Sequence, residues 1–134
     1  MTANEVYINA CALIFEQPEA DTDFKNYFLN FLNILLAEAL PYQNYLLKIA
    51  GETEITAPTV TSFDEAIPYN NELCRTALPY GIVSFYFQDE NDNFKSQDYR
   101  ARYISALEDI VKKGAVTDIT DEYSSYVVGD DEDA

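Results

Sequence analysis

The sequence contains no histidine and no tryptophan, and it has only four glycines and two cysteines. Without histidine, the chain lacks the usual general base near neutral pH and the commonest metal ligand. The few glycines form neither a GxGxxG nor a GxxxxGK[ST] pattern, so no phosphate-binding loop is indicated. We therefore expect no catalytic residue, no cofactor and no enzymatic activity. Hydrolysis by paired carboxylates stays open as an alternative, although no pair stands out among the twenty-four acidic residues.

The two cysteines, Cys11 and Cys74, lie far apart in the chain, and each has apolar neighbours. No CxxC pattern of the kind that binds metals or exchanges disulfides is present. This pattern predicts two buried, reduced thiols.

Long apolar runs are also missing, and none approaches the roughly 20 residues that a membrane-spanning helix needs. The N-terminal residues do not show a basic region followed by an apolar core, which would indicate a signal peptide. The length of 134 residues fits one domain. We expect a globular protein of the cytoplasm that does not contact membranes.

Basic residues are scarce, with eight Lys and Arg against twenty-four Asp and Glu and a formal net charge of −16. Such a chain repels phosphate backbones, which argues against sequence-specific binding of nucleic acid. The charge fits a surface along which DNA slides without sticking, and it also fits a protein that mimics DNA.

Apolar residues recur at spacings of three and four over residues 4–16, 21–51, 70–88 and 93–113. This period is typical of helices with one buried face. Gly51 and Gly114 stand where the second and the last of these helices are expected to end. The sequence therefore predicts an all-α fold, a small bundle of four to five helices in one domain over residues 1–114.

Residues 52–66 show no helical face, and they predict a long extended loop. Within it, Thr59, Val60 and Thr61 either pair as an added strand with another chain or belong to a loop that covers the protein's own core.

Residues 115–134 contain seven acidic residues and no basic one. They predict an extended C-terminal arm with an acidic tail. Ile119, Tyr123 and Tyr126 are its candidate contacts with a subunit or a partner.

The phrase ALPY occurs twice, at Ala39–Tyr42 and at Ala77–Tyr80. Two copies are too few for a helical repeat array, so each phrase is better explained as a structural joint. Pro41 and Pro79 interrupt the helical hydrogen bonds and are predicted hinges. Gly81 follows only the second phrase, where it permits a sharper bend or a close neighbour.

The stretch DENDN at residues 89–93 resembles the start of a calcium-binding loop. The sixth position of such a loop requires glycine and is Phe94, and the twelfth requires glutamate and is Arg100. We expect a capped turn between two helices here, and no metal site.

Five of the eight basic residues lie within residues 94–113. Arg100 and Arg102 in this stretch could meet the acidic surface of a neighbouring subunit, or they could form salt bridges within their own chain.

Four phrases follow one another in the second half of the chain: IPY at Ile67–Tyr69, LPYG at Leu78–Gly81, an acidic turn at Asp89–Asp92 and YRARY at Tyr99–Tyr103. Their order resembles the head-tail connector proteins of tailed bacteriophages, also called adaptor or head-completion proteins. Such proteins are small and largely helical, and they form a ring beneath the portal that joins the capsid to the tail.

The resemblance implies a structural virion protein at the neck, assembled in the host cytoplasm. Its partners would be identical subunits in a ring, the portal protein and a tail-side stopper or tail-completion protein, and DNA would pass through the lumen. The alternative that the charge supports is an acidic DNA mimic, or another phage interaction protein, that inhibits a nucleic-acid-binding enzyme.

Overall fold

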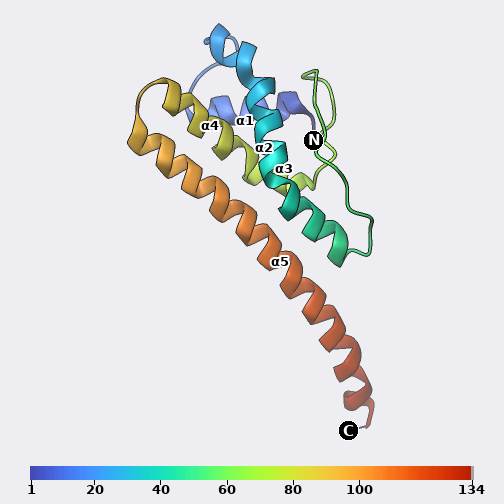
Figure 1. Ribbon diagram of the computed structural model, residues 1–134. Coiled ribbons are helices and arrows are strands. Elements are labelled where there is room, and N and C mark those ends of the chain that lie inside the picture. The colour runs from blue at the N-terminus through green and yellow to red at the C-terminus, as the bar shows by residue number, and fades with distance from the viewer. Residues whose placement is uncertain (134) are drawn as a thin grey trace.

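A computed structural model describes the backbone of residues 1–133 and the side chains of residues 1–116. Residues 1–133 form five helices: α1 (Ala3–Leu13), α2 (Thr22–Ile49), α3 (Asn71–Thr76), α4 (Leu78–Asp89) and α5 (Asn93–Asp133) (Figure 1). The described part contains no strand, only an isolated bridge between Thr2 and Ala66. The predicted all-α bundle is confirmed.

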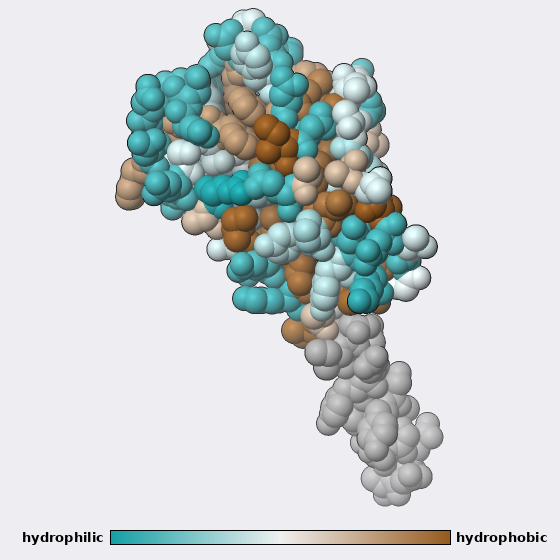
Figure 2. Space-filling view, in the orientation of Figure 1, coloured by the Kyte–Doolittle hydropathy of each residue, from teal (hydrophilic) through white to brown (hydrophobic). Residues whose placement is uncertain are grey.

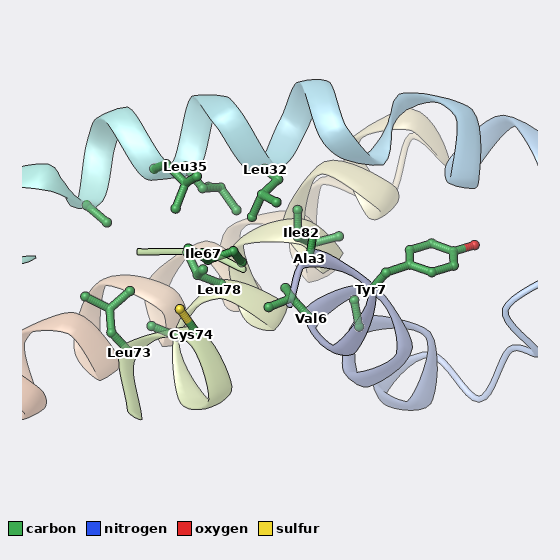
Figure 3. Close-up of a cluster of buried hydrophobic side chains, with 14 of the residues drawn as sticks. Ala3, Val6, Tyr7, Leu32, Leu35, Ile67, Leu73, Cys74, Leu78 and Ile82 are labelled. Atoms are coloured by element: carbon green, nitrogen blue, oxygen red, sulfur yellow. The ribbon is translucent and has the colours of Figure 1, made fainter. Parts of the chain in front are cut away.

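Helix α4 is the centre of the bundle. It contacts each of the other four helices, and it packs most extensively along α5, to which a tight turn connects it (Figure 1). Residues on all sides of its first half are buried, which is typical of a helix enclosed by neighbours. The close-up in Figure 3 shows Leu78 and Ile82 of α4 between Leu32 and Leu35 of α2 and Val6 of α1.

Helix α1 starts one residue earlier and ends three residues earlier than the predicted helix over residues 4–16. Thr2 caps its N-terminus, because the Glu5 N–H donates to the Thr2 hydroxyl while the Glu5 carboxylate accepts from the Thr2 N–H. At the other end, Phe15 has a φ of 56°, which turns the chain away before Pro18 is reached.

Helix α2 begins at the predicted signal and ends at the predicted glycine. The Phe24 N–H donates to the Asp21 carboxylate, which caps the helix. Gly51 has a φ of 76°, and its N–H donates to the Lys48 carbonyl. The Glu52 N–H donates to the Leu47 carbonyl, which completes the Schellman arrangement that favours glycine.

Helix α2 continues through Pro41, so no new helix starts there, and the hinge predicted at this proline stays a prediction. A proline removes the N–H that would bond the carbonyl four residues earlier, here Ala37. Both Pro41 and Ala37 are exposed, so water can bond this carbonyl. The carbonyl that lacks its helical hydrogen bond thus faces solvent, and the buried face of α2 keeps its packing.

The single helix predicted over residues 70–88 is two helices, α3 and α4, which meet at Ala77. Asn70 caps α3, since its side chain accepts from the Leu73 N–H. Pro79 lies in the first turn of α4, where a proline sacrifices no helical hydrogen bond. The second ALPY phrase is therefore a joint between helices, whereas the first lies within one helix.

Gly114 does not end a helix as predicted, because α5 continues through it. A Cβ atom at this position would lie 3.0 Å from Leu46 Cδ2 and 3.0 Å from Ile49 Cδ1. The glycine instead lets α5 approach the end of α2 closely. The extended arm predicted over 115–134, with Ile119, Tyr123 and Tyr126, involves side chains outside the described residues.

The loop over residues 52–66 lies along α2 and is fixed to it by two asparagines. Asn33 accepts from the Val60 N–H at 2.8 Å and donates to the Val60 carbonyl at 2.9 Å. Asn44 makes the same pair of bonds with Ile55, both at 2.9 Å. Val60 is only 2% exposed, so this loop covers the protein's own core.

Candidate functional site

Three of the four phrases that carry the family resemblance converge on one point of α2. The Tyr69 hydroxyl donates to the Leu36 carbonyl at 2.5 Å, and the Tyr103 hydroxyl donates to the Leu35 carbonyl at 3.2 Å. A Cβ atom on Gly81 would lie 2.7 Å from Leu35 Cδ1 and 3.2 Å from Tyr103 Cδ1. Residues that are far apart in the sequence thus meet at two consecutive leucines.

Burial keeps both hydroxyls in their donor form. Desolvation raises the pKa of Tyr69 from 10.0 to about 12, and it also raises the pKa of Tyr103. Both rings are buried and both hydroxyls are bonded to backbone. This cluster therefore stabilises the fold, and a binding site must be sought on the surface.

The most distinctive surface feature is a groove between the first half of α2 and the end of α4. Its cavity volume is about 270 Å³. Five aromatic and four acidic residues line it: Phe24, Tyr27, Phe31, Phe85 and Tyr86, with Asp21, Asp23, Asp89 and Glu90. We call this the aromatic–acidic groove. Figure 2 shows apolar side chains between α2 and α4 framed by hydrophilic ones.

The aromatic rings of the groove support one another. Phe31 and Phe85 stack with centroids 4.8 Å apart and an interplanar angle of 13°. Phe24 and Tyr86 meet edge to face at 5.2 Å. Tyr27 stands at the rim and is 56% exposed. The groove thus has a rigid floor and an exposed apolar edge.

The acidic residues give the groove a negative potential. Burial is the main cause that raises the pKa of Tyr86, and the nearby carboxylates of Glu90, Asp21 and Asp89 raise it further. The C-terminal end of α4 adds the negative end of its helix dipole at the same place. Within the described residues, no side chain pairs with the carboxylates of Asp23, Asp89 or Glu90.

The groove continues into a second hollow along α2, of about 440 Å³, because Phe85 lines both. Ile34 forms the apolar wall of this second hollow and is 49% exposed. At its far side, Arg100 of α5 forms an ion pair with Glu38 of α2. An exposed apolar strip on α2 therefore runs from acidic residues at one end to an ion pair at the other.

The sequence pattern pointed only indirectly to this strip. Tyr27 and Phe31 fall in the same apolar run as the buried residues Phe28 and Leu32. The one indication in the sequence was the width of the apolar stripe. The apolar run covers more of the helix circumference than a single buried face requires, so some of its residues were expected to be exposed. Which of its residues are exposed depends on where α4 lies, and helical spacing does not determine that.

The predicted contact residues are placed as follows. Val60 is buried and both its backbone groups are bonded to Asn33, while the Thr61 N–H and hydroxyl donate to Glu65. Thr59 is exposed. The loop is thus already engaged by its own chain at Val60, where an added strand would need free backbone groups.

Arg100 and Arg102 both form ion pairs within their own chain, which is the second of the two alternatives that the sequence left open. Arg100 is bonded to Glu38 on α2 and lies over the Tyr103 ring, with Cζ 5.2 Å from the centroid. Arg102 pairs with Asp98 one turn earlier on α5, at 3.2 Å. Arg100 therefore connects two helices, whereas the Arg102 pair is local to the surface.

The stretch at residues 89–93 forms a capped turn. The Lys95 N–H donates to the Asp92 carboxylate at 3.1 Å, and Asn91 adopts a φ of 57°. Among the residues that the structure describes, no group of three or more His, Cys, Asp or Glu side chains is placed to hold a metal ion. The turn interpretation is confirmed.

Both cysteines are buried and free, as predicted. Burial raises the pKa of the Cys74 thiol to about 11, and it raises the pKa of Cys11 as well. Neither thiol is therefore an activated nucleophile.

Comparison with known proteins identifies no relative: no family, no curated protein and no solved structure matches this chain. Over the part of the chain that was searched, no helix combines the length and the apolar character needed to cross a membrane.

Proposed function

We propose that this protein is a structural subunit of a bacteriophage neck, one of several copies in a ring that joins the portal to the tail. The observation that carries the proposal is the convergence of Tyr69, Gly81 and Tyr103 on Leu35 and Leu36. A chance match of short phrases would not require its members to meet. Their meeting supports the interpretation that the phrases are the signature of one connector-like fold.

The charge of the molecule is consistent with a channel for DNA. Among the side chains of residues 1–116, five ion pairs engage five acidic residues, and the whole chain carries a formal net charge of −16. A ring of such subunits would present a lumen that repels the phosphate backbone and lets DNA pass. The partners in this proposal are identical subunits, the portal protein and a tail-side stopper or tail-completion protein.

Native mass spectrometry of the chain, alone and mixed with a candidate portal protein from the same genome, tests the proposal. We expect a closed ring of several copies on the portal. A chain that remains monomeric and binds neither portal nor tail protein, at any ionic strength, would refute the assignment.

An acidic mimic of DNA is a second candidate, which the formal net charge of −16 favours. Such a mimic would displace DNA from a basic enzyme of the host. A competition assay with labelled duplex DNA and a host nuclease distinguishes it, because a neck subunit would leave the DNA complex intact.

A further inference from the structure

We propose that the aromatic–acidic groove is the docking site for a basic amphipathic helix supplied by a different protein. The groove presents two kinds of surface side by side. Exposed Tyr27 and Ile34, with partly buried Phe31 between them, form an apolar strip, and Asp89 and Glu90 form an acidic end. A helix with apolar residues on one face and Lys or Arg beside them complements both surfaces.

The dimensions of the groove suit a helix. Tyr27, Phe31 and Ile34 are spaced by four and three residues, so they lie along one face of α2. The lining of the two adjoining hollows runs on α2 from Asp23 to Glu38. At 1.5 Å per residue this is about 22 Å, or roughly four turns of a docked helix.

The charges of the groove define the sign of the partner. The carboxylates of Asp23, Asp89 and Glu90 have no ion-pair partner among the described side chains. They lie next to exposed aromatic edges, where a guanidinium or ammonium group gains both Coulomb and cation–π attraction. An acidic or purely apolar helix would leave these carboxylates desolvated and unpaired.

The chain itself is a poor source of such a helix. Its own cations are few, and Lys25, Lys95, Arg100 and Arg102 are already paired with carboxylates of the same chain. Residues 117–134 contain no Lys or Arg. A second copy also carries a formal charge of −16, so long-range repulsion opposes self-docking. The complementary cations must therefore come from elsewhere.

This inference goes beyond the neck assignment and does not depend on it. If the chain is a neck subunit, the helix would belong to a neighbouring neck protein. If it has another role, the groove keeps the same requirement for a basic amphipathic segment. The two proposals can consequently fail separately.

A designed peptide is a suitable probe. It has about sixteen residues, enough for four turns, with Leu at helical spacing on one face and Lys or Arg on the flanks. The control peptide has Glu in place of every Lys and Arg. We expect the basic peptide to bind one to one in isothermal titration calorimetry at low salt, and the acidic peptide not to bind.

Variants of the protein distinguish the groove from its general charge. In D89K/E90K both changes lie at the acidic end of the groove, at a helix C-terminus where cations are tolerated. E52K/E54K makes the same change in net charge on the exposed loop, away from the groove. We expect D89K/E90K to weaken peptide binding by roughly tenfold or more and E52K/E54K to weaken it far less.

The apolar strip is tested by Y27A/I34A, in which two exposed side chains are truncated without opening the core. We expect a similar loss of binding with an unchanged circular dichroism spectrum and melting temperature. Equal effects of D89K/E90K and E52K/E54K would overturn the proposal, as would binding that Y27A/I34A leaves intact. Concentration-dependent self-association that Y27A/I34A abolishes would show that a second copy is the occupant, which would also overturn it.

Discussion

At the scale of single residues, Gly81 has closer neighbours than the other glycines that the structure describes. Leu35 and Tyr103 approach the position that a side chain would occupy, and both are fully buried. Gly114 has a superficially similar environment, but its neighbours Leu46 and Ile49 are only partly buried ends of α2 side chains. The two glycines therefore allow a matched test of whether close packing or helix propensity determines how a change to alanine affects stability.

We expect Gly81→Ala to destabilise the protein. Overpacking against Leu35 and Tyr103 costs about 1–3 kcal/mol. The higher helix propensity of alanine offsets about 1 kcal/mol of this cost. Gly114→Ala gains the same propensity while its neighbours can move aside, so we expect it to be neutral or slightly stabilising. Urea denaturation measures both, and equal effects of the two changes would contradict the packing argument.

Alkaline pH should weaken the fold through the buried tyrosines. Because the pKa of Tyr69 rises from 10.0 to about 12 on folding, its stabilising effect is complete below pH 10 and is lost as pH rises toward 12. Tyr69→Phe cannot ionise at this position, so its stability should fall less over that range than that of the wild type. Urea midpoints at pH 8 and pH 11 for both proteins check this, and parallel losses would show that other groups control the transition.

At the scale of elements, the helical period predicted where helices form. The residues expected to start or end a helix did so where the cap is made by hydrogen bonds within the same segment. Asp21 and Gly51 act at the two ends of α2 as their residue types predict. Gly114 was misjudged because its effect depends on which neighbour it faces, and that is set by tertiary packing. Pro41 lies inside the continuous helix α2, and its predicted role as a hinge stays a prediction. The split at Ala77 shows the opposite case, in which a proline does mark the start of a new helix.

The loop over residues 52–66 supplies the prediction at this scale. Asn33→Ala removes both bonds to Val60 and leaves buried backbone groups without partners, so we expect a loss of about 2 kcal/mol. The amide of Val60 should exchange with deuterium much faster. Asn30→Ala, at an exposed position on the same helix, is the control and should change neither quantity. Unaltered exchange at Val60 in the Asn33 variant would show that burial alone holds the loop.

At the scale of the whole molecule, the large negative charge is the property that composition predicts best. Composition alone predicted an acidic globular chain without metal or nucleotide chemistry, but it could not locate the aromatic–acidic groove. That groove exists because α2 and α4 leave Phe31 and Phe85 stacked at their common edge, and helical spacing does not fix how two helices are placed. The candidate site therefore required the structure, whereas the fold class did not.

Ionic strength should act in opposite directions on the two proposed associations. Copies of a chain with a formal charge of −16 repel one another, so ring formation should strengthen as salt shortens the Debye length from about 30 Å at 0.01 M to about 10 Å at 0.1 M. Binding of a basic helix should weaken over the same range. Sedimentation velocity for the free chain and calorimetry with the basic peptide measure the two trends, and trends of the same sign would contradict this electrostatic account.

The distance between the two asparagines on α2 matches the distance between their partners in the loop. Asn33 and Asn44 are eleven residues apart on a helix, or about 16 Å at 1.5 Å per residue. Their partners Val60 and Ile55 are five residues apart in an extended chain, which also spans about 16 Å. Because the two lengths are commensurate, one residue inserted or deleted between Ile55 and Val60 would force one asparagine to release its partner.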